Sequence, residues 1–392
     1  MTQYEDLIYV LNDWNLIGQP ATRYTVPNLN IQQDGQNNYL ISYSYFKTAQ
    51  EIIDAGYYDF TGSPAENIVS SIDYSNDTEI AIEKILNPIN IWSVSFSDVA
   101  KINFSEDENN TGVITFGQLD GGGSVFVSEN VSAVTLQYNP SVINADKQHG
   151  DIWINTNQDS ANGDGVFSDY NIWEQSGNIE AGTQAYKILM EEIAHSLGVD
   201  IYDEFNVVRN SDLDSHKYTV TSYYSHPDMV YSTTTIIGYS QSYVIQEASG
   251  NPWTSSLGIF DIAALQEIYG TNSDTRNEDR GFTDGDADTT GTLYTIGKGF
   301  GATASTPFIY TIWDGGGDTD TIDASGYADG VQIDLREGHF SSIGKNGNTS
   351  TGDHVWWDAE AEAGGKPSGY DAGNVAIAYG TVIENAIGTA YD

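Results

Sequence analysis

Residues 191–201 read Glu-Glu-Ile-Ala-His-Ser-Leu-Gly-Val-Asp-Ile, and this stretch decides how the rest of the chain is interpreted. Its order follows the zinc-binding pattern H-E-x-x-H-x-x-G-x-x-H, in which two histidines four residues apart share one helix face and a glycine turns the chain toward a third. Glu192 and His195 keep their places in that pattern, whereas Glu191 and Ile201 stand at the two outer histidine positions. The sequence therefore keeps the frame of a zinc site but not its ligand set.

A helix over residues 183–197, stopped by Gly198, is predicted to carry this stretch. Its buried stripe follows helical spacing and consists of Tyr186, Leu189, Ile193 and Leu197. Glu191, Glu192 and His195 are placed on the remaining surface of the helix. Since residues three and four apart are neighbours on a helix, their side chains are expected to converge over one turn.

Strand and helix signals alternate ahead of the motif helix. Hydrophobic alternation predicts strands at residues 39–46, 99–104, 112–117 and 151–155. Helical spacing is found at Ile82, Ile85, Leu86 and Ile89, at residues 4–17, and at residues 259–269 before Gly270. These signals predict an α+β fold, with a mixed sheet preceding the motif helix.

The composition changes beyond about residue 273 to glycine, aspartate and threonine with short apolar pairs, which indicates an all-β region. Its acidic turns offer closely spaced oxygen ligands of the kind that calcium prefers. The candidate calcium ligands are Asp314, Gly316, Asp318 and Asp320 in one turn, and Asp284, Asp286 and Asp288 in another. We expect a lead segment at 1–35, a mixed-sheet domain at 36–272 and a glycine- and aspartate-rich β domain at 273–392.

The charge balance excludes several classes of partner. The 392 residues include 56 Asp and Glu but only 14 Lys and Arg, which gives a formal net charge of -42. Such a surface repels nucleic acid and anionic membranes, so neither is expected as a partner. The sequence has no cysteine, no apolar run long enough to span a membrane, and no basic start followed by an apolar run that would indicate a cleaved signal peptide.

Several separated stretches occur in the order typical of one family. They are the 191–198 segment, Phe96-Ser-Asp-Val-Ala100, Phe260-Asp-Ile-Ala-Ala-Leu-Gln-Glu-Ile-Tyr-Gly270, Ile312-Trp-Asp-Gly-Gly-Gly-Asp-Thr-Asp320 and Ile383-Glu-Asn-Ala-Ile-Gly388. Together they resemble the serralysins, calcium-dependent zinc endopeptidases of the metzincin clan that bacteria secrete. The resemblance implies a metzincin-like domain with an active-site helix, followed by a calcium-binding β-roll or sandwich-like domain. It also implies leaderless export and an extracellular location. The sequence contains only the start of such a roll, without the nonapeptide array.

The departures from the family pattern cluster at the metal site. A family stretch Ser-x-Met-Ser-Tyr, which supplies a methionine beneath the zinc and a tyrosine that reaches it, corresponds to Thr219-Val-Thr-Ser-Tyr223. Thr221 replaces the methionine, and Tyr223 keeps its place. Together with positions 191 and 201, this indicates a site released from zinc.

Three functional hypotheses follow. The first is a secreted calcium-binding protein on a serralysin fold whose dismantled zinc site supports no conventional peptidase, so that the chain is a pseudoenzyme or a repurposed enzyme. The second is a zinc metalloendopeptidase with the altered ligands Glu191, His195 and Tyr223. The third is a glycan-active hydrolase or lyase using Glu191 or Glu192, with His195 and Tyr223.

These hypotheses share several expectations. A protein, peptide or polysaccharide is expected to bind in the cleft. Calcium is expected as a cofactor, and zinc is expected to bind weakly or not at all. The chain is expected to be a monomer. His216 and His226 flank Tyr223 as further candidate ligands, but they are interpreted as ordinary loop histidines. Crowding of Glu191 against Glu192 is expected to raise the pKa of one of them.

Overall fold

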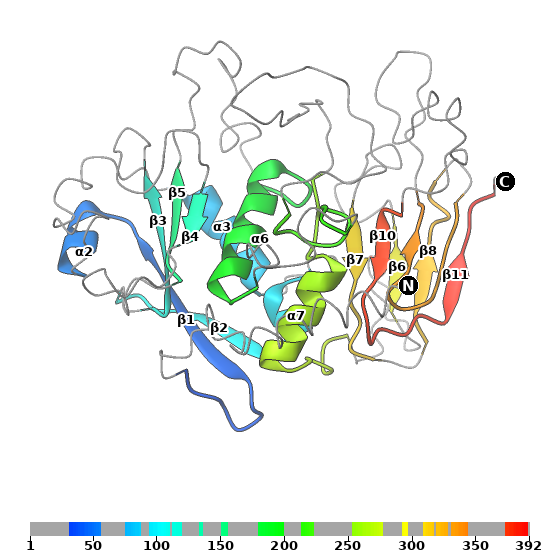
Figure 1. Cartoon of the computed structure of the whole chain (residues 1–392), viewed down its shortest axis with the longest axis horizontal. Coiled ribbons are helices and arrows are strands. Elements are labelled where there is room, and N and C mark those ends of the chain that lie inside the picture. The colour runs from blue at the N-terminus through cyan, green and yellow to red at the C-terminus, as the bar shows by residue number, and fades with distance from the viewer. Residues whose placement is uncertain are drawn as a thin grey trace, which may run out of the picture.

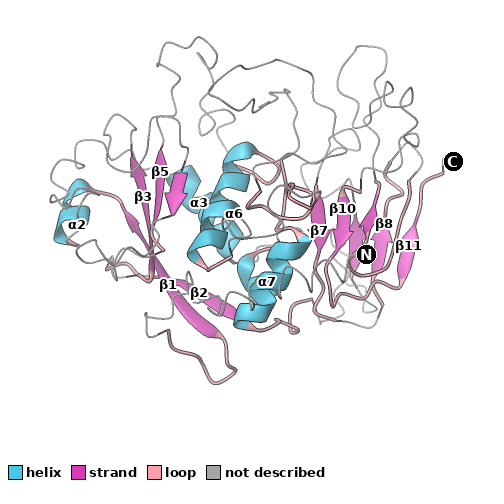
Figure 2. Cartoon of the chain, viewed as in Figure 1, coloured by secondary structure: helices cyan, strands magenta, loops and turns pink. Residues whose placement is uncertain are grey.

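The computed structural model describes residues 31–55, 75–87, 94–109, 112–119, 133–135, 150–155, 179–199, 213–222, 253–276, 292–296, 309–316, 319–327, 331–343 and 373–390. Its elements form three groups side by side (Figure 1). A sheet lies at one end, helices lie in the middle, and a second set of strands lies at the other end. The colouring by secondary structure makes the same division plain (Figure 2). The α+β class is thereby confirmed.

The first sheet has five strands in the order β2-β1-β3-β5-β4. Its strands are β1 (Tyr39–Phe46), β2 (Ile102–Glu106), β3 (Ile114–Leu119), β4 (Ala133–Thr135) and β5 (Ile152–Asn155). All neighbouring pairs are parallel except β4 with β5, which is antiparallel. The mixed sheet predicted ahead of the motif helix is therefore confirmed, and β1 has the bounds expected from its alternation.

One local prediction for this sheet needs correction, and one of its strands was not predicted. The strand expected at residues 99–104 begins only at Ile102, because Val99 ends the short helix α4 (Phe96–Val99). A capping box stabilises the start of that helix, since Ser95 Oγ accepts from the Asp98 N–H and the Asp98 carboxylate accepts from the Ser95 N–H. Strand β4 was not predicted, because a segment of three residues is too short to show a period.

Capping residues and glycines mark the ends of the main helices. They are α2 (Ala49–Asp54), α3 (Asn76–Leu86), α6 (Gln184–Ser196) and α7 (Ile259–Tyr269). Helix α6 starts after Thr183, whose hydroxyl accepts from the Tyr186 N–H at 3.3 Å. Gly198 and Gly270 follow α6 and α7 with φ of 84° and 86°, a conformation that glycine adopts at little cost. The predicted helices at 183–197 and 259–269 are confirmed. Residues 4–17 and Ile89 lie outside the described residues.

The described elements beyond residue 273 are all strands. They are β6 (Leu293–Thr295), β7 (Tyr310–Ile312), β8 (Thr321–Asp323), β9 (Phe340–Ser341), β10 (Val375–Ile377) and β11 (Asn385–Ile387). They form two three-stranded sheets, ordered β7-β10-β9 and β11-β8-β6. The division of the chain at residues 35 and 272 stays a prediction.

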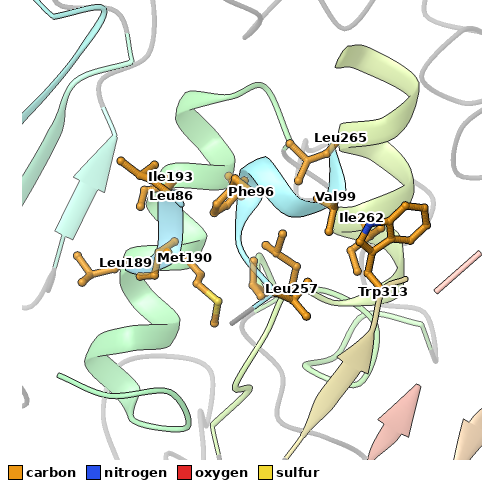
Figure 3. Close-up of a cluster of buried hydrophobic side chains, with 14 of the residues drawn as sticks. Leu86, Phe96, Val99, Leu189, Met190, Ile193, Leu257, Ile262, Leu265 and Trp313 are labelled. Atoms are coloured by element: carbon orange, nitrogen blue, oxygen red, sulfur yellow. The ribbon is translucent and has the colours of Figure 1, made fainter. Parts of the chain in front are cut away.

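One continuous hydrophobic core joins the helices to both groups of strands. Figure 3 shows Trp313, which follows β7, beside Val99 and Ile262, while Leu189 of α6 lies farther along the same cluster. The Trp313 indole Nε1 donates to the Asp98 carbonyl oxygen at 3.0 Å. Arg276 forms an ion pair with the Asp98 carboxylate at 3.2 Å, both side chains being almost fully buried. The two halves of the chain are thus tied together by apolar packing and by buried polar contacts.

Candidate functional site

Helix α6 presents Glu191, Glu192 and His195 on one side, as their spacing predicts. They lie outside the buried stripe of the helix, but other elements cover them. Glu191 and Glu192 are only 5% and 8% exposed, and the side chain of His195 is 19% exposed. Strand β4 and the 213–222 segment contact this side of the helix and cover the carboxylates.

A lysine that the sequence analysis missed neutralises Glu191. Lys187 is 3% exposed, and its Nζ lies 2.7 Å from Glu191 Oε2. The same Nζ donates to the carbonyl oxygen of Ser222 at 3.2 Å. A buried ammonium group is tolerated only when it is paired and hydrogen-bonded, and both conditions are met here. The sequence signal for this ion pair was the position of Lys187, four residues before Glu191 on the same helix face.

Glu192 has a different partner. Thr135 of β4 places its hydroxyl oxygen 2.6 Å from Glu192 Oε2 and 2.8 Å from the Glu192 carbonyl oxygen, so it donates to one of these two acceptors. Burial raises the pKa of Glu192, Glu191 adds to the increase, and His195 and the Thr135 hydrogen bond oppose it. The upward shift expected for one of the two glutamates is therefore found at Glu192, but its main cause is burial.

The remaining carboxylate oxygen of Glu191 faces His195. Glu191 Oε1 is buried and has no hydrogen-bond partner among the described residues, and His195 Nε2 lies 4.0 Å away from it. Zinc is the metal that the serralysin resemblance implies at this place, and two of its ligands in a tetrahedron lie about 3.3 Å apart. The spacing is wider, and the carboxylate is already paired with an ammonium group. These donors do not fit a zinc ion of the family type.

The 213–222 segment closes the site through hydrogen bonds. His216, 5% exposed, places Nε2 2.8 Å from the Ser222 carbonyl oxygen, the same oxygen that accepts from Lys187. Thr221 is fully buried, and its hydroxyl lies 2.9 Å from that of Thr219. A polar network thus replaces the methionine that the family resemblance places here. Ile201, Tyr223 and His226 lie outside the described residues.

Asp261 of α7 accepts hydrogen bonds from that network. Its carboxylate accepts from the Thr219 hydroxyl at 2.6 Å, the Val220 N–H at 2.8 Å and the Gly258 N–H at 2.7 Å. Burial raises the pKa of Asp261 to about 6 against these hydrogen bonds. The buried carboxyl group of Asp261 therefore helps to hold the segment leading to Tyr223 against α7.

The predicted calcium turn is partly described. Asp314 and Asp320 are 1% and 2% exposed, and Glu384, which the sequence analysis missed, accepts from the Asp320 N–H at 2.7 Å. Asp314 accepts from the Tyr294 hydroxyl and from the Gly316 N–H. Burial raises the pKa of Asp320 to about 6, and the carboxylates of Asp314 and Glu384 add to it. Asp318 and the 284–288 turn lie outside the described residues.

Comparison with known proteins finds similarity to serralysins over part of the chain. The family profile described as "Peptidase M10 serralysin C terminal" matches residues 271–371. Serralysin C of Dickeya chrysanthemi is 31% identical over 232 residues, covering 57% of this chain and 39% of the relative. Serralysin of Proteus mirabilis is 30% identical over 308 residues, covering 75% and 50%. Metalloprotease AprA of Pseudomonas entomophila is 28% identical over 308 residues, covering 75% and 49%. These matches span about half the length of the relatives, or less.

None of the helices in the described ranges combines the length and the apolar character that crossing a bilayer requires.

Proposed function

Since the chain is a serralysin-like protein, we propose that it keeps the family's architecture but is not a conventional zinc peptidase. It would be a secreted, calcium-binding protein in which a metzincin-like domain precedes the start of a β-roll. It would act as a pseudoenzyme or a repurposed enzyme that holds a peptide, protein or polysaccharide beside α6. Its site residues would be Glu191, Glu192, His195 and Tyr223.

One observation carries the proposal: the 2.7 Å ion pair between Lys187 and Glu191. A zinc ion held by the same carboxylate would be repelled by the ammonium group. For charges of +2 and +1 about 4 Å apart, the repulsion is about 8 kcal/mol at an effective dielectric constant of about 20. Lys187 already supplies the positive charge that the carboxylate needs, so zinc binding is expected to be weak.

The test is to measure zinc and proteolysis in the full chain. After dialysis against zinc and then buffer, elemental analysis is expected to find far less than one zinc per chain, and casein cleavage that a zinc chelator blocks is expected to be absent. The double variant Lys187→Gln/Glu191→His is expected to gain zinc affinity by at least about tenfold, since it restores a histidine ligand and removes the competing charge. Stoichiometric zinc with casein cleavage in the natural chain would reject the proposal.

Two observations keep the alternatives testable. Glu191 Oε1 has no hydrogen-bond partner in the described part of the chain and lies 4.0 Å from His195 Nε2, which favours the altered-ligand endopeptidase. His195→Ala would then abolish both metal binding and cleavage. The raised pKa of Glu192 favours an acid or base role in a glycan-active enzyme. In a polysaccharide screen, turnover that survives Glu192→Gln would exclude Glu192 from that role.

A further inference from the structure

A second cluster of acidic side chains lies away from the α6 site, where α3 meets the edge of the first sheet. Glu79 and Glu83 are one turn apart on α3, and Glu106 ends β2. One carboxylate oxygen from each residue lies within 4.8 Å of those of the other two. Glu79 is 14% exposed at its side chain, so the cluster is partly removed from water.

A buried tyrosine hydroxyl accompanies the three carboxylates. Tyr45 is 3% exposed, and its hydroxyl oxygen is buried without a hydrogen-bond partner among the described residues. Tyr43 is the register partner of Glu106, and Tyr45 lies two residues farther along β1, on the same face of the sheet. Lys47 Nζ contacts both the Tyr45 ring and Glu79, which places the Tyr45 side chain beside the cluster. Leaving such a group buried and unpaired is unfavourable unless a ligand satisfies it.

The positive charge near the cluster is insufficient to neutralise it. Lys47 Nζ lies 3.3 Å from Glu79 Oε2 and 5.6 Å from the centre of the Tyr45 ring, and its side chain is 44% exposed. Three carboxylates and one ammonium group leave a net charge of −2. The cluster thus lacks the charge of one divalent cation.

We propose that Glu79, Glu83 and Glu106 bind a calcium ion, with the Tyr45 hydroxyl as a neutral oxygen at its buried side. Calcium binds oxygen at 2.3–2.6 Å, so ligand oxygens on opposite sides of the ion are about 4.6–5.2 Å apart and adjacent ones are closer. The three carboxylates meet this spacing as they stand. The ion would fasten α3 to β2, and the site is independent of the function proposed for α6.

The test is calorimetric titration of the chelator-treated full chain with calcium chloride. Glu83→Gln is expected to remove one calcium equivalent or to weaken it at least about tenfold. Asp77→Asn is the matched control, because it makes the same charge change at an exposed position on the same helix. It is expected to bind calcium as the natural chain does.

A second variant separates calcium binding from loss of folding. Lys47→Met removes the ammonium group that competes for Glu79, so it is expected to raise the calcium affinity of this site several-fold. A gain of affinity cannot come from misfolding. Unchanged calcium binding in either Glu83→Gln or Lys47→Met would overturn the proposal. Equal binding of magnesium would overturn its assignment to calcium.

Discussion

Carboxylates are buried on α6 and again near Asp314 in the β half, but the two regions neutralise them differently. On α6, Glu191 has an internal cation, since Lys187 lies one helical turn before it. Near Asp314, the buried carboxylates of Asp314 and Asp320 and that of the exposed Glu384 form no ion pair within the described part of the chain. They accept instead from hydroxyl and backbone N–H groups.

This difference indicates which region depends on an added metal. On α6, Lys187 already neutralises Glu191, so added metal should not change the stability of this region. In the Asp314 region three carboxylates lie close together. Burial and their mutual repulsion raise the pKa of Asp314 and Asp320, so an added divalent cation should stabilise the folded chain there. The three predictions below test this contrast.

The largest effect is expected for Lys187→Met. Removing the ammonium group leaves Glu191 buried without its partner, which should lower the free energy of unfolding by about 3–5 kcal/mol. Urea denaturation followed by circular dichroism measures the change. The control is Lys187→Met/Glu191→Leu, which removes both charges and should recover most of the loss. A single variant as stable as the natural chain would show that the ion pair is not formed.

An intermediate effect is expected from removing calcium. If Asp314 and Asp320 bind it, calcium at about 100 times its dissociation constant adds about 2.7 kcal/mol of stability, and chelation removes it. Thermal unfolding with calcium and with a chelator measures the difference. Asp320→Asn should shrink that difference, whereas Asp274→Asn, at an exposed position, should not. A thermal midpoint unaffected by chelation would show that this turn is not a calcium site.

The smallest effect is a pH dependence in calcium-free protein. Because the pKa of Asp320 is raised to about 6 in the folded chain, the folded state binds more protons than the unfolded state between about pH 4 and pH 6. Stability is therefore expected to fall as pH rises through this window, by on the order of 1 kcal/mol for this group. Denaturation curves at several pH values measure the slope. Asp320→Asn should flatten it in part, and the slope that remains reflects the other carboxyl groups whose pKa is raised, among them Asp261. An equal slope in the variant would contradict the assignment.

The sequence predicted the parts of the fold that follow from local pattern. Helix α6 was found from the spacing of Tyr186, Leu189 and Ile193, and its end from Gly198. Strand β1 was found from its alternation. In each case neighbours in sequence determine the structure, so a period or a terminal glycine suffices.

The sequence did not predict the environment of the site, because its partners come from distant segments. Thr135 and Ser222 cover Glu192 and Lys187 from 57 and 35 residues away along the chain. Helix α6 alone looks polar on that side, and only the packing of β4 and the 213–222 segment buries it. The Lys187 pair was visible in the sequence, but its importance depends on this burial.

The buried pair also makes position 191 difficult to change one residue at a time. A histidine at 191 alone would leave the Lys187 ammonium group buried without its carboxylate, and loss of Lys187 alone would leave the carboxylate without its cation. Each single step toward a histidine ligand set thus passes through a less stable protein. Such a barrier would act as an evolutionary ratchet, because positions 187 and 191 would have to change together.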